Sequence, residues 1–214
     1  YNGAAQEGVT VFDANVDNGW RSGTARECVA PAAGRPNVTV LTGAQATKVT
    51  IENGRATGVA YRHRGQDVTA RAAREVILSA GAFQSPQLLM LSGLGPADHL
   101  REHGIEVAAD LPGVGENLQD HLEVHLKFTC PHKGMTRNKL MARHRILLAG
   151  IEWFLFKSGP ASLPPSRVGA FLKSNAAASH PDIQFHFWPY LLEGWSPPPD
   201  KDGYCFDVGP VRSE

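Results

Sequence analysis

The pattern of apolar and polar positions predicts five strands in the first half of the chain. Residues 38–41 and 76–78 are short runs of apolar and β-branched side chains, as expected of strands covered on both faces. Three further strands are predicted between them, over residues 48–51, 56–62 and 67–70. A meander inserted between two buried strands is typical of the latter half of a dinucleotide-binding α/β fold.

Turn residues favour the meander and place a helix after the second buried strand. Asn53-Gly54 separates two of the predicted strands and is the strongest short hairpin signal, because both turn positions favour positive φ. Ser85 is a favourable N-cap and Pro86 suits the first helical position, so a helix is predicted over residues 87–91. Its N-terminus lies beyond the end of a strand, where α/β sheets bind ligands.

Glycines punctuate this region closely. The Ser-Gly pair at 92–93 ends the predicted helix, and the Gly-Pro pair at 95–96 starts another helix that stops at Gly104. Gly81 has no side chain, so its backbone can turn sharply and lie close to a ligand. The alternative is that these glycines only serve the tight turns between strands and helices, as in any α/β protein.

The second half of the chain has a different pattern, typical of an α+β domain. The predicted elements are a strand over residues 122–130, a helix over 138–157 and strands over 168–174 and 183–189. The last of these strands alternates, with Gln184, His186 and Trp188 on one face and two phenylalanines on the other.

Composition narrows the classes of function. The 214 residues carry 21 basic and 21 acidic side chains, so the formal net charge of zero gives no field that would gather nucleic acid. The three cysteines lack the spacing of a disulfide framework or a zinc site, which is typical of a reducing, cytoplasmic compartment. The longest apolar run, residues 146–156, is about half a membrane-spanning helix, so no membrane-spanning segment is expected. The chain begins with tyrosine and ends after a predicted strand, and we expect an interior piece of a longer protein.

Residues 81–95, GAFQSPQLLMLSGLG, resemble the second signature of the glucose-methanol-choline (GMC) family of flavin oxidoreductases. The surrounding sequence resembles the family in the same order. RPNVTVLTG precedes the signature, and DLPGVGENLQDHLE (residues 110–123) and PDIQFHFWP (residues 181–189) follow it. This ordered set covers most of the chain and is more specific than a lone glycine-rich motif. The sequence is most similar to choline dehydrogenase-like members.

The resemblance implies FAD-dependent oxidation of an alcohol to a carbonyl, in which the flavin takes a hydride from the substrate and a histidine removes the hydroxyl proton. It also implies a domain organisation: a connecting, substrate-side segment over residues 1–37, the C-terminal half of the FAD-binding domain over 38–120, and part of the substrate domain, with an antiparallel sheet, over 121–214. The family's phosphate-binding glycine fingerprint and principal catalytic histidine are not found in this sequence. We therefore expect the chain alone to be inactive and to bind FAD weakly or not at all.

Seven residues match positions that hold the cofactor in the family. Ala46 matches a position whose main chain reads the adenine edge, and the SAG triplet at 79–81 matches the lining of the adenosine end. Residues of the ENLQDH motif match positions at the junction of the two domains, near the flavin. The implied cofactor residues are Ala46, Ser79, Ala80, Gly81, Asn117, Asp120 and His121. The alternatives are an ordinary strand alanine, a tight turn and a hydrogen-bonded loop cap.

Three further residues match the family's substrate site. His186 matches a histidine that stabilises the developing alkoxide, in a supporting role. Glu123 matches the glutamate that faces the trimethylammonium group in choline-oxidising relatives. Arg167 stands where those relatives more often carry an acidic residue, and a cation there would repel choline or neutralise Glu123. The alternative is that Glu123 and Arg167 form a surface pair on neighbouring strands.

The predicted substrate is accordingly a primary or secondary alcohol, with choline as the leading named candidate. Two other functions stay open at this point: a non-catalytic fragment of the same fold, and a lyase-type member of the family that uses FAD structurally. A nicotinamide-dependent dehydrogenase is disfavoured, because no acidic ribose-binding residue follows a glycine-rich turn.

Overall fold

The computed structural model describes residue 3 and residues 5–194, 198 and 200–211. The chain has mixed helix and strand content and divides into two compact units. One unit is Arg35–Gln119, and the other combines the chain up to Gly34 with the chain from Asp120 onward. Within the described residues, no helix has both the length and the apolar character needed to cross a membrane.

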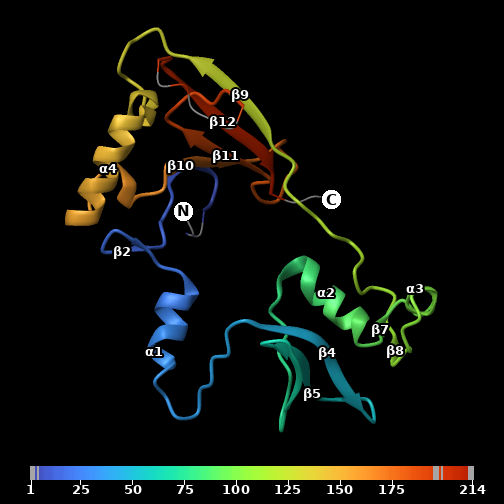
Figure 1. Ribbon diagram of the computed structural model, residues 1–214. Helices are drawn as coiled ribbons and strands as arrows, with labels where there is room; N and C mark the ends of the chain where they lie inside the picture. The colour runs from blue at the N-terminus through green and yellow to red at the C-terminus, as the bar shows by residue number, and fades with distance from the viewer. Residues whose placement is uncertain (1–2, 4, 195–197, 199, 212–214) are drawn as a thin grey trace. The chain divides into compact units, whose positions relative to one another are not determined.

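The unit Arg35–Gln119 contains the predicted meander. Its three antiparallel strands are β4 (Ala44–Glu52), β5 (Arg55–His63) and β6 (Gln66–Arg71), in that order in the sheet (Figure 1). The turn between β4 and β5 has positive φ at both central residues, 53° at Asn53 and 73° at Gly54. Because only residues that tolerate the left-handed region fit there, the Asn-Gly pair sets the hairpin. The meander prediction is confirmed.

The helix that follows is α2 (Gly81–Leu91), and it begins earlier than predicted. Ala80 occupies the N-cap position, and Gly81 starts the helix with a φ of 89°. The prediction that Ser85 is the N-cap and Pro86 the first helical residue is wrong, because Pro86 lies inside the helix. The Ser85 hydroxyl instead accepts a hydrogen bond of 3.0 Å from the Ala80 N–H, which provides a capping contact from within the first turns.

The end of α2 is fastened to the meander by a buried serine. Ser92 is only 2% exposed. Its hydroxyl accepts a 2.8 Å hydrogen bond from the Val49 N–H and donates one to the Leu88 carbonyl. Gly93 has a φ of 84° and carries its backbone so close to the Glu106 carbonyl that a side chain would collide with it. The predicted helix end at 92–93 is therefore confirmed, and it has a structural reason.

The remainder of this unit is small. β7 (Leu94–Gly95) and β8 (Ala109–Asp110) pair in parallel, and α3 (Ala97–Glu102) lies between them in the chain. The helix begins after Pro96, as predicted, and the chain turns at Gly104 with a φ of 68°. Leu100 is fully buried and centres this small core.

Two strand predictions in this unit are wrong. Residues 38–41 and 76–78 are not strands, and Val40, Leu41 and Ile77 are 50%, 47% and 76% exposed. Their composition favours strands, but a strand also needs a hydrogen-bonded neighbour. Within the described part of the chain neither segment has one.

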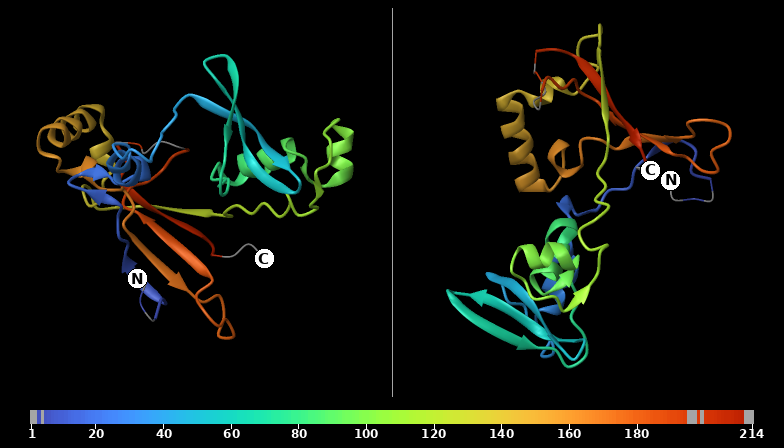
Figure 2. Two further views of the ribbon diagram at one scale, coloured as in Figure 1. Left: turned by 90° about the horizontal axis from the view of Figure 1, so that it is seen from below. Right: turned by 90° about the vertical axis from the view of Figure 1, so that its right-hand side faces the viewer.

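The other unit is built on a five-stranded antiparallel sheet. Its strands are β1 (Gly8–Val11), β9 (Val124–Thr129), β10 (Val168–Leu172), β11 (Ile183–Trp188) and β12 (Gly203–Pro210), in the order β1-β10-β11-β12-β9. Figures 1 and 2 show neighbours of very different colour, with yellow-green β9 beside red β12. The strands predicted over 122–130, 168–174 and 183–189 are confirmed, whereas sequence analysis assigned no strand to residues 8–11.

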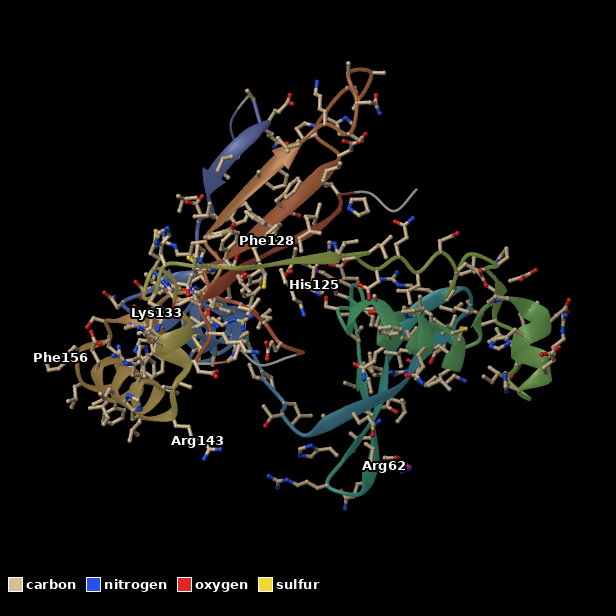
Figure 3. All side chains as sticks on the ribbon, turned by 90° about the horizontal axis from the view of Figure 1, so that it is seen from above. Arg62, His125, Phe128, Lys133, Arg143 and Phe156 are labelled. Atoms are coloured by element: carbon tan, nitrogen blue, oxygen red, sulfur yellow. The ribbon has the colours of Figure 1, made fainter. Side chains whose placement is uncertain are left out.

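The two faces of this sheet differ, as the alternation in β11 predicts. One face carries a cluster of aromatic rings, in which Phe187, Phe206, Tyr204 and Phe128 follow one another at centroid distances of 5.3 to 5.9 Å. The other carries Gln184, His186 and Trp188 of β11 and their cross-strand neighbours. Figure 3 marks His125 and Phe128 on β9, which the same alternation assigns to opposite faces.

Helices and short strands complete this unit. They are β2 (Val16–Asp17), β3 (Trp20–Arg21), a π-helix over Ala25–Val29, α1 (Ala30–Ala32), 3-10 turns at Asn138–Met141 and Pro160–Ser162, and α4 (Arg143–Phe156). The helix predicted over 138–157 is thus confirmed in part, because extended backbone at Ala142 separates the 3-10 turn from α4. Lys157 ends α4 in the left-handed region, and Trp153 Nε1 donates a 2.6 Å hydrogen bond to the Gly19 carbonyl.

Candidate functional site

A row of three ionisable side chains crosses the polar face of the five-stranded sheet. His186 on β11 lies directly opposite Asp207 on β12, and Asp207 lies directly opposite His125 on β9. Residues that face each other across antiparallel strands point to the same side, with their Cβ atoms about 5 Å apart. Strand register therefore places two imidazoles on either side of one carboxylate.

Asp207 is the buried member of the row, with 5% of the residue exposed. Its two oxygens have separate donors: His125 Nδ1 contacts Oδ1, and the Trp188 indole Nε1 contacts Oδ2. The indole N–H can only donate to this carboxylate, and His125 donates in the tautomer that carries its proton on Nδ1. A buried carboxylate without such partners would be costly, and the two donors offset that cost.

A hollow opens over this row, with a volume of about 310 Å³. It is lined by Glu123, Pro164, Pro165, Ser166, His186, Trp188 and Asp207. The loop that forms one side is held to β11 by the Ser166 hydroxyl, which donates a 2.9 Å hydrogen bond to the Phe187 carbonyl. The lining contains two carboxylates, one imidazole and one indole, and it contains neither lysine nor arginine.

The far side of His186 is supported by an aromatic ring from the N-terminal part of the chain. Phe12 lies with its ring centroid 5.4 Å from that of His186 and 6.0 Å from that of Phe171. Gly169, opposite His186 on β10, makes room for this ring, because a side chain at that position would collide with Phe12 and with the Phe185 carbonyl. Phe12 thus fixes His186 from the side opposite Asp207.

A buried tyrosine lies beyond Trp188. Tyr190 is 7% exposed, and its ring centroid is 5.7 Å from that of Trp188. Burial raises the pKa of the Tyr190 phenol, and the nearby acidic groups of Cys205 and Asp207 raise it further. The fully buried Asn138 holds the next residue by accepting a 2.9 Å hydrogen bond from Leu191 N–H. The end of β11 is therefore rigidly anchored.

Two of the three predicted substrate-site residues share the hollow, and the third does not. Glu123 and His186 both line it, whereas Arg167 does not. Arg167 precedes β10, which two strands separate from β9, and no ion pair joins it to Glu123 among the described residues. The alternative of a surface pair on neighbouring strands is wrong. Arg167 Nε is buried and has no hydrogen-bond partner in the described structure.

The predicted cofactor residues of the other unit are exposed. Ala46 lies on β4, and Ser79, Ala80 and Gly81 lead into α2, all open to solvent. A Cβ placed on Gly81 would meet no atom within 4 Å. The start of α2 has free space around its backbone, where a ligand would meet the positive end of the helix dipole.

Asn117 lies beside α2 in a second hollow of about 470 Å³. Its backbone is left-handed, with a φ of 56°, and Ala82 and Met90 of α2 line the same hollow. Asp120 and His121 belong to the other unit, where the Asp120 carboxylate accepts a 2.8 Å hydrogen bond from the His121 N–H. The lining of this hollow is mostly apolar and includes the amides of Asn117 and Gln119 and the carboxylate of Glu116.

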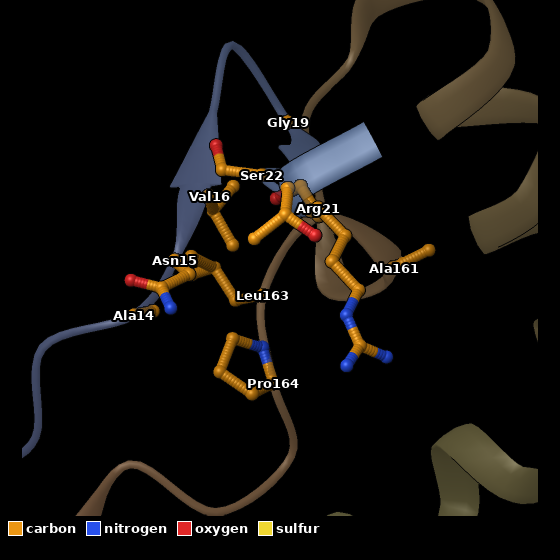
Figure 4. A pocket seen from close by; sticks show the side chains of 12 residues that line it. Ala14, Asn15, Val16, Gly19, Arg21, Ser22, Ala161, Leu163 and Pro164 are labelled. Atoms are coloured by element: carbon orange, nitrogen blue, oxygen red, sulfur yellow. The ribbon is translucent and has the colours of Figure 1, made fainter. Parts of the chain in front are cut away.

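A larger hollow of about 670 Å³ lies near the N-terminal strands (Figure 4). Arg21 and Leu163 line it from two different segments of the chain, together with hydroxyl residues such as Ser22 and Thr24. It contains no carboxylate, histidine or cysteine, so its described lining offers no group that titrates near neutral pH. Size alone therefore does not identify the reactive site.

Sequence analysis missed His125, Asp207 and Phe12. Asp207 and His125 are 82 residues apart in the chain, and only the pairing of β12 with β9 brings them together. The alternation of β9 was a usable signal for the direction in which His125 points, but nothing in the sequence paired it with β12. No group of three or more metal-ligating side chains is found in the part of the chain that the structure describes.

Comparison with known proteins gives matches that cover the chain. A family model described as GMC oxidoreductase matches residues 1–123. The oxygen-dependent choline dehydrogenase of Brucella ovis is 42% identical over 217 residues, which is 100% of this chain and 39% of that protein. The chain thus spans about two fifths of the length of such curated relatives.

Solved structures show the same fold. A formate oxidase matches with a TM-score of 0.83 and 24% identity, covering 97% of this chain and 40% of its own. The pyridoxine 4-oxidase from Mesorbium loti matches with a TM-score of 0.75 and 26% identity, covering 97% of this chain and 37% of its own.

Proposed function

Because the chain belongs to the GMC oxidoreductase family, we propose that it forms part of an FAD-dependent enzyme that oxidises an alcohol to an aldehyde or ketone. The observation that carries this proposal is the hollow shared by Glu123 and His186 on the polar face of the sheet. Two residues that the family resemblance assigns to the substrate line the same hollow, which supports this proposal.

In this proposal the unit Arg35–Gln119 belongs to the FAD-binding domain, with the meander inserted in a dinucleotide-binding fold. The main chain of Ala46 and of residues 79–81 would hold the adenosine end, and Asn117, with Asp120 and His121, would lie near the flavin. The exposed backbone at Gly81 and the hollow beside α2 support this assignment. When bound, FAD supplies an acceptor for the hydride of the alcohol carbon.

The five-stranded sheet belongs to the substrate domain and supplies the residues that hold the alcohol. His186 would donate an N–H to the alcohol oxygen and stabilise the negative charge that develops on it. Phe12 and Asp207 on its two sides restrict its position, so the donor is oriented before the substrate arrives.

Glu123 would select the substrate by its charge. The carboxylate has no hydrogen-bond or ion-pair partner among the described residues, and it lines a hollow without lysine or arginine. It is therefore available to an ammonium group, with Trp188 offering an aromatic face nearby. Alcohols that carry a cation fit this site best, and choline, the substrate in the name of the Brucella relative, is the leading candidate. Arg167, outside the hollow, does not neutralise Glu123.

The test uses the complete enzyme with bound FAD and a panel of choline and uncharged alcohols of similar size. His186→Ala is expected to lower kcat by about a hundredfold with every alcohol, because it removes a charge-stabilising donor. Glu123→Gln is expected to raise KM only for cationic alcohols. Flavin absorbance of each variant controls for cofactor loss. Turnover of neutral alcohols equal to that of choline in both wild type and Glu123→Gln would overturn the substrate assignment.

A further inference from the structure

We propose that Asp207 is a positioning residue that fixes the Trp188 indole as a wall of the substrate hollow and thereby sets which alcohols fit. The inference rests on the proposed function, because it takes the hollow lined by Glu123 and His186 as the substrate site. It concerns two residues, Asp207 and His125, that neither motif nor family resemblance marks.

The hydrogen bonds of Asp207 define its task. Both carboxylate oxygens are already used, one by His125 and one by Trp188, although His186 lies directly opposite on the next strand. Asp207 therefore holds the side chains of His125 and Trp188 in place. Its burial strengthens these contacts, because charge-assisted hydrogen bonds weaken when water competes for the donor.

Trp188 is the side chain on which this fixation acts. An indole has a large planar ring and one N–H, so a bond to that N–H removes most of its freedom to rotate about the side-chain torsions. Trp188 lines the hollow and stacks at a tilt against the buried Tyr190. The carboxylate and the tyrosine both contact the indole and restrict its position.

His125 completes the arrangement from the solvent side. Its side chain is 47% exposed, and it approaches Asp207 from the edge strand β9. By occupying the second oxygen it keeps the carboxylate turned toward Trp188. The two carboxylates of the hollow therefore have different tasks: Asp207 orients a neighbour, and Glu123 is left for the substrate.

The kinetic test is Asp207→Asn in the complete enzyme. An asparagine has one accepting oxygen, and its NH2 group only donates, so it cannot present an oxygen to each of His125 and Trp188. We expect KM for the preferred alcohol to rise about tenfold, with kcat changed less than about threefold, as for the loss of one charge-assisted hydrogen bond. The preference over a bulkier alcohol should fall by a similar factor, because the indole is released. Trp188→Phe should act in the same direction, and the double variant should not exceed the larger single effect.

A spectroscopic measurement tests the positioning itself. The indole N–H resonance of Trp188, identified by its loss in Trp188→Phe, is expected to move upfield or broaden in Asp207→Asn. Asp67→Asn, at an exposed carboxylate of the meander, is the matched control and should change neither the resonance nor KM. An unchanged indole resonance in Asp207→Asn would overturn the inference.

A milder variant covers the case in which Asp207→Asn does not fold. His125→Gln removes only the half-exposed partner, and we expect a smaller shift of the same resonance and a smaller rise in KM. Unchanged values for both would equally overturn the inference. If the wild-type enzyme oxidises no alcohol of the panel, the proposed function fails, and the resonance alone then decides whether Asp207 positions Trp188.

Discussion

The two sheets of this chain are built in opposite ways. In the meander, β4, β5 and β6 follow one another in sequence and pair in the same order through tight turns. In the five-stranded sheet, β12 lies between β11 and β9, and β1 pairs with β10 more than 150 residues further along. Local pairing makes the meander a hairpin unit, whereas the larger sheet collects segments from distant parts of the chain.

This difference explains where the chemistry lies. In the proposed function the meander offers the cofactor only main chain, at Ala46. The five-stranded sheet brings together Glu123, His125, His186 and Asp207, which no short segment contains. Non-local pairing is slower to form, but it allows side chains from several strands to converge on one site. The predictions below test whether the larger sheet is also the more sensitive of the two.

The largest effect is expected from Gly169→Ala. The new methyl group would meet the Phe12 ring and the Phe185 carbonyl, and the carbonyl belongs to a central strand and cannot move aside. Overpacking of this kind costs about 1–3 kcal/mol of unfolding free energy. Because Phe12 also packs on His186, KM for the alcohol should rise as well. Thermal unfolding and steady-state kinetics of the complete enzyme measure the two effects.

Gly150→Ala is the matched control. Gly150 lies in the middle of α4, and a side chain there would meet nothing within 4 Å. Alanine is the better helix former by about 1 kcal/mol, so this variant should be neutral or slightly more stable. Equal loss of stability in the two variants would contradict the collision at Gly169.

A smaller effect is expected from Gly54→Ala in the meander. Gly54 has a φ of 73°, which an alanine adopts only with strain, so we expect a loss of about 1 kcal/mol. Hydrogen exchange should increase in β4 and β5 and stay unchanged in β9 to β12. Asn53→Gly is the control, because glycine adopts the φ of 53° at that position without strain. A change in exchange that spread to the five-stranded sheet would contradict the local nature of the meander.

The same contrast explains what could be predicted from sequence. The meander was predicted because its signals are local: short strand segments and an Asn-Gly turn that requires positive φ. Residues 38–41 and 76–78 have equally strong local signals, yet they are not strands. Apolar composition favours a strand, but the strand forms only where a neighbouring strand supplies hydrogen-bond partners. The same limit applied to β1, whose partner β10 lies far along the chain.

The residues of the candidate site also fall into two groups, those that local motifs identify and those that only strand pairing brings together. Glu123 and His186 could be named in advance because each lies in a motif that resembles the family. Asp207 and His125 could not, because their relation exists only through the register of β9 and β12. The position of Arg167 depended on register too: assigning it to a strand next to Glu123 required a strand order that the sequence does not contain.

The stability of the larger sheet should depend on pH through Asp202, which lies just before β12. Its carboxylate accepts hydrogen bonds from the Thr136 hydroxyl at 2.6 Å and the Gly134 N–H at 3.0 Å, and these lower the pKa of Asp202 below the usual 3.8. A lowered pKa in the folded state means that the stabilisation is present above pH 3.8 and is lost as the pH falls through the folded value.

Asp202→Asn should therefore lower the Tm at neutral pH, and the difference from wild type should shrink as the pH falls below 3.8. Asp200→Asn, two residues earlier, is the control for removing one acidic charge from the same segment. Unfolding followed by circular dichroism from pH 7 downward measures both. A Tm difference that stayed constant with pH would mean that the hydrogen bonds of Asp202 do not depend on its charge.

The smallest effect is expected from Arg62→Gln in the meander. Arg62 pairs with Asp67 at 2.9 Å, and the hydrogen bond and the opposite charge raise the pKa of Arg62 and lower that of Asp67. The two side chains are 60% and 73% exposed, however, so water and salt screen the attraction. We expect Tm at physiological salt to stay within experimental error of wild type. The pair resembles that of His125 and Asp207 in chemistry and differs from it in burial, since Asp207 is 5% exposed. A large loss of Tm in Arg62→Gln would mean that exposure is a poor guide to the strength of such pairs, and the contrast between the two sheets would lose its physical basis.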